Sequence, residues 1–361
     1  MQRRRFLVKT GGVLAAAAAT AAVNAPNVIA QPKFKWRLAT SFPPKLPPLH
    51  DGAEMFAKIV SKATESRLQI DVFGAGEIVP GLENFDATRQ GTIEAGYGAA
   101  YYWAGKEPAT QWFTAVPFGL NAQGTQAWVT SGGGQKIYEE LYSAFNLVPR
   151  PFGATGVQMG GWFRRKIESI DDYKGLKMRI PGLGGKVVAK AGGTVVLLAA
   201  ADIFTSLERG VIDATEWVGP YQDARLGLYK AAKLYYYPGW HEPGTTGELF
   251  FNRKAYDSLP AAFRSVIDGA AAQAGVWTFM EQEARNSVVL EQLRGQHGVQ
   301  LVKFPDKVLS ELRKLSDEVA QEEASKSPMA KKVAESHDKF KRQWLAWSNL
   351  SERAYYNMMF A

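Results

Sequence analysis

Two similar segments of eleven residues constrain the fold of this chain more than any other feature. They begin at Phe85 and at Phe204, 119 residues apart. Each predicts a short helix, then a glycine suited to the left-handed position after a helix (Gly91 or Gly210), then a strand entered through Ile, an acidic residue and Ala. Because the same helix–glycine–strand pattern occurs twice, the sequence predicts two lobes of related construction.

Hydrophobic periodicity identifies each lobe as α/β. Residues 34–38 alternate between apolar and polar, residues 53–60 place apolar side chains on one helical face, and residues 68–72 alternate again. Strand, helix and strand at this spacing predict a β-α-β unit and a parallel sheet. A further strand is expected at 176–180, followed by a glycine-rich tight turn at 181–185 before another helix.

The first thirty residues have the composition of an export signal. Three arginines at 3–5 precede an alanine-rich apolar run of about eleven residues, and Ala30 precedes a plausible cleavage site. A membrane-spanning helix needs roughly 20 apolar residues, so we interpret 1–30 as a signal peptide. Paired arginines followed by Phe-Leu also resemble a twin-arginine signal. The sequence therefore predicts an exported bacterial protein located in the periplasm.

Composition narrows the class of ligand. The chain has no cysteine, which excludes disulfides, thiolate metal sites and a cysteine nucleophile. Without the four basic residues of the signal, 39 basic face 35 acidic residues, a mild excess without the basic stripe that nucleic-acid binding requires. About 330 mature residues favour two domains. A small anionic ligand suits this chain better than a polyanion.

Motifs of enzymes are largely missing from the sequence. The four histidines show no paired metal-ligand spacing, and no G-x-S-x-G nucleophile elbow occurs. The glycines at 132–134 lack the Lys-Ser/Thr of a phosphate loop, and those at 182–185 lack the third glycine of a dinucleotide motif. The sequence predicts a binding protein and not an enzyme, although a catalytic carboxylate pair stays open.

Three polar residues are candidates for a ligand site. Arg179 ends an otherwise apolar strand, and its guanidinium can hold a carboxylate through two parallel hydrogen bonds. Glu216 follows another apolar strand, where a buried carboxylate needs a cation or a metal ion as partner. Gln158 offers a carbonyl oxygen to a hard cation and an amide donor to a ligand. Outward-facing or core positions remain the alternative for all three.

Aromatic clusters could line the same site. Tyr101 and Tyr102 stand beside Trp103, and Trp240 precedes His241 and Glu242. Either cluster can equally belong to a hydrophobic core.

Together these segments resemble the extracytoplasmic solute receptors of tripartite ATP-independent periplasmic (TRAP) transporters, the DctP type. The resemblance spans nearly the whole mature chain and is carried by residues 74–81, 116–118, 160–163 (Gly-Gly-Trp-Phe), 175–179 and 210–214. It implies a two-lobed periplasmic binding protein of the class II, Venus-flytrap kind, with C-terminal helices bracing the lobes. It also implies that Arg179 is the carboxylate anchor and that membrane permease subunits are the partners.

A closer likeness is to the 2-oxo acid-binding branch, through residues 156–165, 215–221 and 236–240. That likeness implies a metal cation, most often sodium with calcium as the alternative, held by Gln158, Glu216 and the backbone carbonyl of Trp217. The ligand would be a small carboxylate such as pyruvate, contacted by Arg179, Gln158, Tyr101, Tyr102, Trp217 and Glu242. The cation would polarise the 2-oxo or 2-hydroxy oxygen.

The expected organisation is lobe I at 31–156 plus 245–284 and lobe II at 157–244 plus 285–338. Residues 339–361 are expected to form a C-terminal helix whose apolar side chains pack on the body or on a second subunit, as in a homodimer. Other organic acids (2-hydroxy, sugar or aromatic), a sensor subunit, or a periplasmic enzyme with Glu216 as its base remain alternatives.

Overall fold

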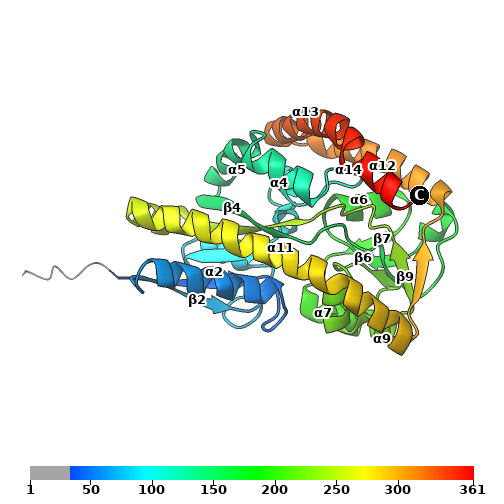
Figure 1. The fold of residues 1–361 in the computed structure, drawn as a ribbon, viewed down its shortest axis with the longest axis horizontal. Coiled ribbons are helices and arrows are strands. Elements are labelled where there is room, and N and C mark those ends of the chain that lie inside the picture. The colour runs from blue at the N-terminus through cyan, green and yellow to red at the C-terminus, as the bar shows by residue number, and fades with distance from the viewer. Residues whose placement is uncertain (1–32) are drawn as a thin grey trace, which may run out of the picture. The chain divides into compact units, whose positions relative to one another are not determined.

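The computed structural model describes residues 33–361, so the predicted signal peptide at 1–30 lies outside the described residues. The fold contains two sheets (Figure 1). The five-stranded sheet has the order β2-β1-β3-β10-β4, with β1 parallel to β3 and β10 antiparallel to both β3 and β4. Its strands are β1 (Phe34–Thr40), β2 (Leu68–Phe73), β3 (Ala95–Gly98), β4 (Leu147–Ala154) and β10 (Thr246–Asn252). We call this sheet and its helices lobe I.

The six-stranded sheet has the order β11-β9-β5-β8-β6-β7 and forms lobe II. Strands β6, β7 and β8 are parallel to one another, whereas β5 is antiparallel to β8 and β9. The strands are β5 (Gly161–Phe163), β6 (Lys177–Arg179), β7 (Thr194–Val196), β8 (Ala214–Thr215), β9 (Leu234–Tyr237) and β11 (Gln300–Lys303). The predicted α/β class with two lobes is confirmed.

The repeated segments occupy equivalent places in the two sheets. Helix α3 (Asn84–Arg89) leads through Gly91 into β3, and α7 (Ala200–Glu208) leads through Gly210 into β8. Both glycines have positive φ, 77° and 73°, the conformation predicted for the residue after a helix. Each repeated strand pairs in parallel on one side and antiparallel on the other.

Helices cover both sheets. Helix α2 (Leu49–Ala63) buries the apolar face predicted at 53–60, with Asp51 in its first turn and Lys62 in its last, as the helix dipole favours. The other helices are η1 (Ala100–Trp103), η2 (Pro108–Phe113), α4 (Ala122–Thr130), α5 (Gly134–Ser143), η3 (Ile170–Tyr173), α6 (Gly182–Lys190), α8 (Pro220–Leu226), α9 (Leu228–Ala231) and α10 (Arg253–Asp257).

The tight turn predicted at 181–185 is wrong. The glycines at 182–185 form the first turn of α6, not a turn before it. A Cβ at position 184 would lie 2.9 Å from the Cβ of His241, so the glycine allows α6 to pack closely on the neighbouring loop.

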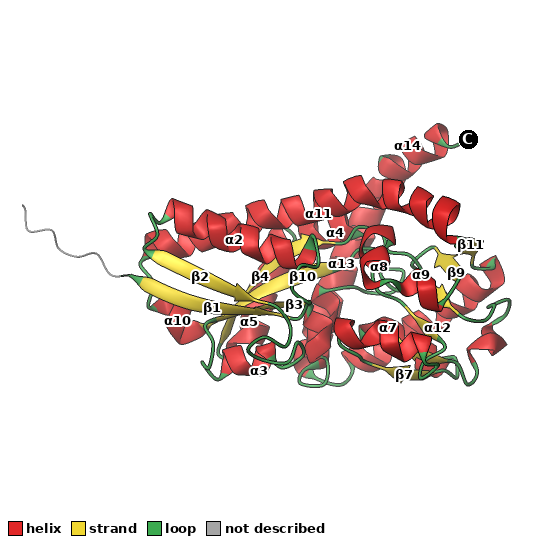
Figure 2. Ribbon diagram, turned by 90° about the horizontal axis from the view of Figure 1, so that it is seen from below, coloured by secondary structure: helices red, strands yellow, loops and turns green. Residues whose placement is uncertain are grey.

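Three connections join the lobes. Residues 155–160 lead from β4 to β5, residues 238–245 return from β9 to β10, and α11 (Ala261–His297) packs on β4 and α2 in lobe I and on α8 in lobe II (Figures 1 and 2). The first two run beside each other, since Thr155 N–H donates to Thr245 O over 2.9 Å and Gln158 N–H to Glu242 O over 3.2 Å. We call 155–160 and 238–245 the crossing segments.

The C-terminal helices brace both lobes, as predicted. Helix α12 (Asp306–Ala324) packs on α6 of lobe II and on η2 of lobe I, and α13 (Pro328–Leu350) packs on η2, α4 and α5. Residue 339 lies within α13, and a separate helix α14 (Glu352–Met359) follows it. Within residues 33–361, no helix is both long and apolar enough to cross a membrane.

Candidate ligand and cation site

A cavity between the lobes collects most of the predicted site residues. Lobe I contributes aromatic side chains, lobe II contributes the loop after β8, and the crossing segments close one side. The lining includes Phe42, Tyr97, Tyr101 and Tyr102 from lobe I, Trp217 and Val218 from lobe II, and Thr155, Gln158 and Thr245 from the crossing segments. A ligand in this cavity contacts both lobes at once.

Arg179 lies at the end of β6 and is 1% exposed. Its Nη1 donates to the Glu216 carboxylate and, over 3.2 Å, to the Glu216 carbonyl, while Nε donates to Leu198 O over 3.3 Å. The guanidinium carbon lies 5.3 Å from the Trp217 ring centroid. These contacts hold the guanidinium in a fixed orientation inside lobe II, so the outward-facing alternative is wrong.

Glu216 is fully buried, and its two oxygens have different surroundings. Oε1 pairs with Arg179, whereas Oε2 lies 3.5 Å from His241 Nε2 and has no hydrogen-bond partner among residues 33–361. Burial raises the pKa of Glu216 to about 7, against the opposing effect of Arg179. Burial also lowers the pKa of His241 to about 4, so this imidazole is neutral at pH 7. Glu216 and His241 are therefore close without forming an ion pair.

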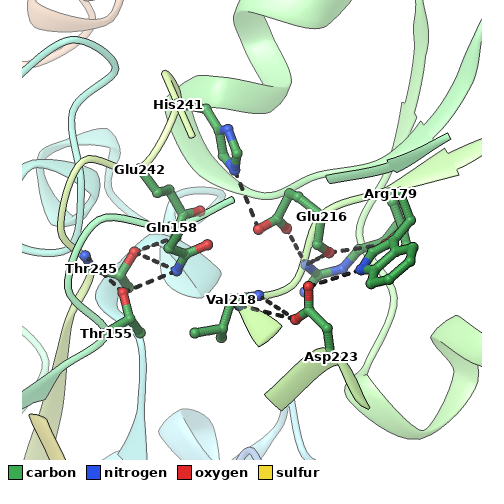
Figure 3. A network of polar contacts seen from close by, with 12 residues as sticks. Thr155, Gln158, Arg179, Glu216, Val218, Asp223, His241, Glu242 and Thr245 are labelled. Atoms are coloured by element: carbon green, nitrogen blue, oxygen red, sulfur yellow. Dashed lines mark hydrogen bonds and ion pairs between the residues drawn. The ribbon is translucent and has the colours of Figure 1, made fainter. Parts of the chain in front are cut away.

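Gln158 and Glu242 face Glu216 from the crossing segments (Figure 3). Gln158 Nε2 donates to Thr155 Oγ1 over 3.2 Å and to Thr245 Oγ1 over 3.0 Å, and Thr245 Oγ1 donates to the Glu242 carboxylate. This chain fixes the amide, because its nitrogen is held by the hydroxyls and its oxygen Oε1 faces the site. Burial, and then the nearby Glu216, raise the pKa of Glu242 to about 7.

Asp223 holds the loop after β8 in place. Its Oδ1 accepts from the N–H groups of Val218 and Gly219 over 3.0 and 3.1 Å, and its Oδ2 accepts from Trp162 Nε1 and Tyr235 OH over 2.8 and 2.7 Å. Four donors to one buried carboxylate fix the backbone from which Glu216 and Trp217 extend. Sequence reasoning did not identify Asp223.

Tyr101 and Tyr102 bring lobe I to the arginine of lobe II. Burial raises the pKa of both phenols, and the positive charge of Arg179 opposes that rise. At Tyr102 a hydrogen bond with Arg179 opposes it as well. Their rings meet edge to face with centroids 4.9 Å apart. The two tyrosines thus lie close to Arg179, which is itself buried.

Several buried polar atoms of this site lack a hydrogen-bond partner within the described part of the chain. They are Gln158 Oε1, Glu216 Oε2, Trp217 Nε1 and both ring nitrogens of His241. Buried polar groups in folded proteins are nearly always satisfied, so a cluster of unsatisfied ones indicates a binding site. Acceptor oxygens together with one indole donor suit a cation next to a ligand that itself accepts a hydrogen bond.

Comparison with known proteins decides the family. Residues 39–327 match the model of the bacterial extracellular solute-binding proteins, family 7 (DctP). The chain belongs to this family. A monocarboxylate 2-oxoacid-binding periplasmic protein of Nostoc sp. is 41% identical over 359 residues, which is 98% of each chain.

Solved DctP structures support the same assignment. A TRAP solute-binding protein of Bordetella bronchiseptica has a TM-score of 0.89 at 36% identity over 91% of this chain and 98% of its own, and is a dimer with calcium and picolinate in one site. One of Pseudoalteromonas atlantica has a TM-score of 0.88 at 39% identity over 90% and 99%, with sodium and pyruvate. These relatives are solute-binding receptors and not enzymes, which confirms the predicted class.

The residues present fit the cation that the DctP family implies. Gln158 Oε1 and Glu216 Oε2 are oxygen donors, as sodium and calcium prefer, and both are buried and unpaired within residues 33–361. The structure brings together Arg179, Gln158, Glu216, Trp217, Tyr101, Tyr102 and Glu242, all predicted from sequence. The sequence placed His241 only in a cluster with Trp240 and Glu242, and its position beside Glu216 was not predicted.

Proposed function

We propose that this DctP protein is a periplasmic receptor for a small 2-oxo monocarboxylate such as pyruvate, bound together with a sodium or calcium ion. The receptor delivers its ligand to the membrane subunits of a TRAP transporter. The relatives from Nostoc sp. and Pseudoalteromonas atlantica support this ligand class, since the first is a 2-oxoacid-binding protein and the second holds pyruvate.

The carboxylate of the ligand pairs with Arg179 in this proposal. The guanidinium is already fixed by Glu216 and by the carbonyl of Leu198, so little side-chain entropy is lost on binding. Tyr101 and Tyr102, on the lobe I side of the cavity, exclude water from the bound ligand. The lower dielectric constant strengthens the ion pair between Arg179 and the ligand carboxylate. The Trp217 indole N–H supplies a further donor to a ligand oxygen.

The cation is held by Gln158 Oε1, the Glu216 carboxylate and the Trp217 carbonyl. It supplies positive charge to the oxygen on the carbon next to the ligand carboxylate. Gln158 lies on a crossing segment, Glu216 in lobe II, and the tyrosines in lobe I. A ligand that contacts all three favours the closed arrangement of the lobes, because it gains contacts there that an open arrangement lacks.

The unsatisfied buried atoms are the observation that carries this proposal. Gln158 Oε1, Glu216 Oε2 and Trp217 Nε1 are buried and unpaired within residues 33–361, and Gln158 and Trp217 line the cavity. A 2-oxo acid with a cation satisfies each of them. A sugar or a polyol would bring no carboxylate to pair with Arg179.

The test is a thermal-shift screen of the mature protein against small carboxylates, each with sodium or calcium. A ligand at about 100 times its Kd stabilises the folded state by about 2.7 kcal/mol. We expect stabilisation by 2-oxo acids, less by simple carboxylates, and none in Arg179→Ala. Equal stabilisation by acetate and pyruvate would contradict the proposal.

The lobe boundaries given above are part of the same proposal. In this proposal the chain passes from one lobe to the other within the crossing segments, at 156–157 and at 244–245. Residues 155–160 and 238–245 are hydrogen-bonded to each other, so lobe motion would bend them together.

A further inference from the structure

We propose that His241 and Glu242 extend the cation site, so that it binds a divalent transition ion such as Zn²⁺ through nitrogen as well as oxygen. The zinc proposal depends on the proposed function in one respect, which is that the 2-oxo acid binds at the same site. Donor atoms of Glu216, His241 and Glu242 lie within 4.8 Å of one another, and all three residues are buried.

The geometry suits the coordination sphere of zinc. Zinc binds imidazole nitrogen at about 2.0–2.1 Å and carboxylate oxygen at about 2.0–2.2 Å, so two ligands of a tetrahedral site are about 3.4 Å apart. Glu216 Oε2 and His241 Nε2 are separated by 3.5 Å. One edge of such a site is therefore already formed, and Glu242, with a carboxylate oxygen within 4.8 Å of both atoms, supplies the third protein ligand.

The imidazole ring packs against Trp240, while its two nitrogens are left without a hydrogen bond in the described structure. His241 is 1% exposed, and neither Nδ1 nor Nε2 has a hydrogen-bond partner among residues 33–361. Burying an imidazole without hydrogen bonds costs free energy, which metal coordination recovers. Figure 3 shows its ring directed at the Glu216 carboxylate.

Charge balance favours a divalent ion over a monovalent one. Arg179 carries one positive charge, and Glu216 and Glu242 carry two negative charges once both bind an ion, because carboxylate ligands are deprotonated when they coordinate a metal. A monocarboxylate ligand adds a third negative charge. A divalent ion makes this group neutral, whereas sodium leaves one negative charge unbalanced in a medium where that is costly. Among divalent ions, a mixed imidazole and carboxylate set favours zinc over calcium, which takes oxygen ligands.

The test is calorimetric titration of the chelator-treated mature protein with ZnCl₂ and, separately, with CaCl₂. We expect His241→Phe to weaken Zn²⁺ binding by at least tenfold and to weaken Ca²⁺ binding less, because calcium takes oxygen ligands. His297→Phe is the matched control, because His297 stacks on Tyr229 at the far end of α11, and Phe retains that contact. Equal Zn²⁺ affinity in wild type and His241→Phe would overturn the proposal.

A second measurement needs no variant. The chain has four histidines, so ¹⁵N-histidine NMR of the wild type can follow each ring during a Zn²⁺ titration. We expect the ring nitrogens of one buried histidine to shift at one equivalent, and no shift of any ring would overturn the proposal. If the protein binds pyruvate but not Zn²⁺, the zinc site at His241 is refuted and the proposed function is not. Zn²⁺ binding without any acid binding would refute only the proposed function.

Discussion

At the scale of single residues, this protein buries carboxylates in two different ways. Glu216 keeps one carboxylate oxygen, Oε2, without a hydrogen-bond partner among residues 33–361. Glu248 on β10 is instead satisfied internally, since it accepts from Trp103 Nε1 over 2.6 Å, from Tyr142 OH over 2.8 Å and from Tyr138 OH. Satisfied and unsatisfied buried carboxylates thus separate structural residues from candidate ligands.

The burial of Glu248 predicts how the stability of the protein depends on pH. Burial raises its pKa from 4.5 to about 7, although its three donors oppose the rise. The folded state therefore holds this proton more tightly than the unfolded chain, and the stabilisation present below pH 4.5 is lost as the pH rises through 7. We expect the unfolding free energy to fall over this range by about 1–3 kcal/mol more in wild type than in Glu248→Gln. Urea denaturation at several pH values measures this, and parallel profiles would contradict it.

At the scale of elements, the crossing segments set the position of the cation ligands. Gly239 N–H donates to Gln158 O over 2.9 Å, and a Cβ at Gly239 would lie 2.2 Å from that oxygen. The close approach of the two segments thus depends on a residue without a side chain. Gln158 and Glu242 are held at the site because their backbones are this close.

Gly239→Ala tests this dependence. The added methyl group must displace residue 158 or 239, so we expect a lower melting temperature and at least a tenfold loss of ligand affinity. Gly105→Ala is the matched control, because a Cβ there meets nothing within 4 Å. Differential scanning fluorimetry and calorimetry compare both variants. Unchanged affinity in Gly239→Ala would show that the segments are more adaptable than their packing indicates.

Hydrophobic periodicity predicted the helices and strands. It pointed to a site residue only where a polar side chain stood at the end of a predicted strand. Arg179 ends β6 and Glu216 directly follows β8, and since these strands are adjacent and parallel, the two residues meet at their carboxyl ends. His241 could not be placed in this way, since it lies in an irregular loop with no strand register. The start of α6 was mispredicted because three glycines in five residues weaken the local helix signal.

At the scale of the whole molecule, the C-terminal end has an apolar surface that the described chain does not cover. Helix α14 contains no buried residue, and Tyr355, Met358 and Phe360 are 55%, 70% and 78% exposed. Trp344, earlier in the chain, packs against the core of the protein. So large an apolar surface on a terminal helix favours contact with a second copy, as a dimeric relative from Bordetella bronchiseptica suggests.

Removal of residues 352–361 tests that contact. We expect the mature protein to be a dimer and the truncated protein a monomer with unchanged ligand affinity, because α14 packs on α13 and not on the cavity. Sedimentation velocity determines the two masses. A truncated protein that is still a dimer would place the interface elsewhere.

The most direct test of the account is the coupling between cation and acid in one site. We would titrate the mature protein with pyruvate in a calorimeter, first with sodium or calcium and then after a chelator in a buffer without either ion. If the cation bridges Gln158 and Glu216 to the ligand, its removal weakens pyruvate binding at least tenfold, and pyruvate strengthens cation binding by the same factor. Equal pyruvate affinity in both buffers would contradict the shared site.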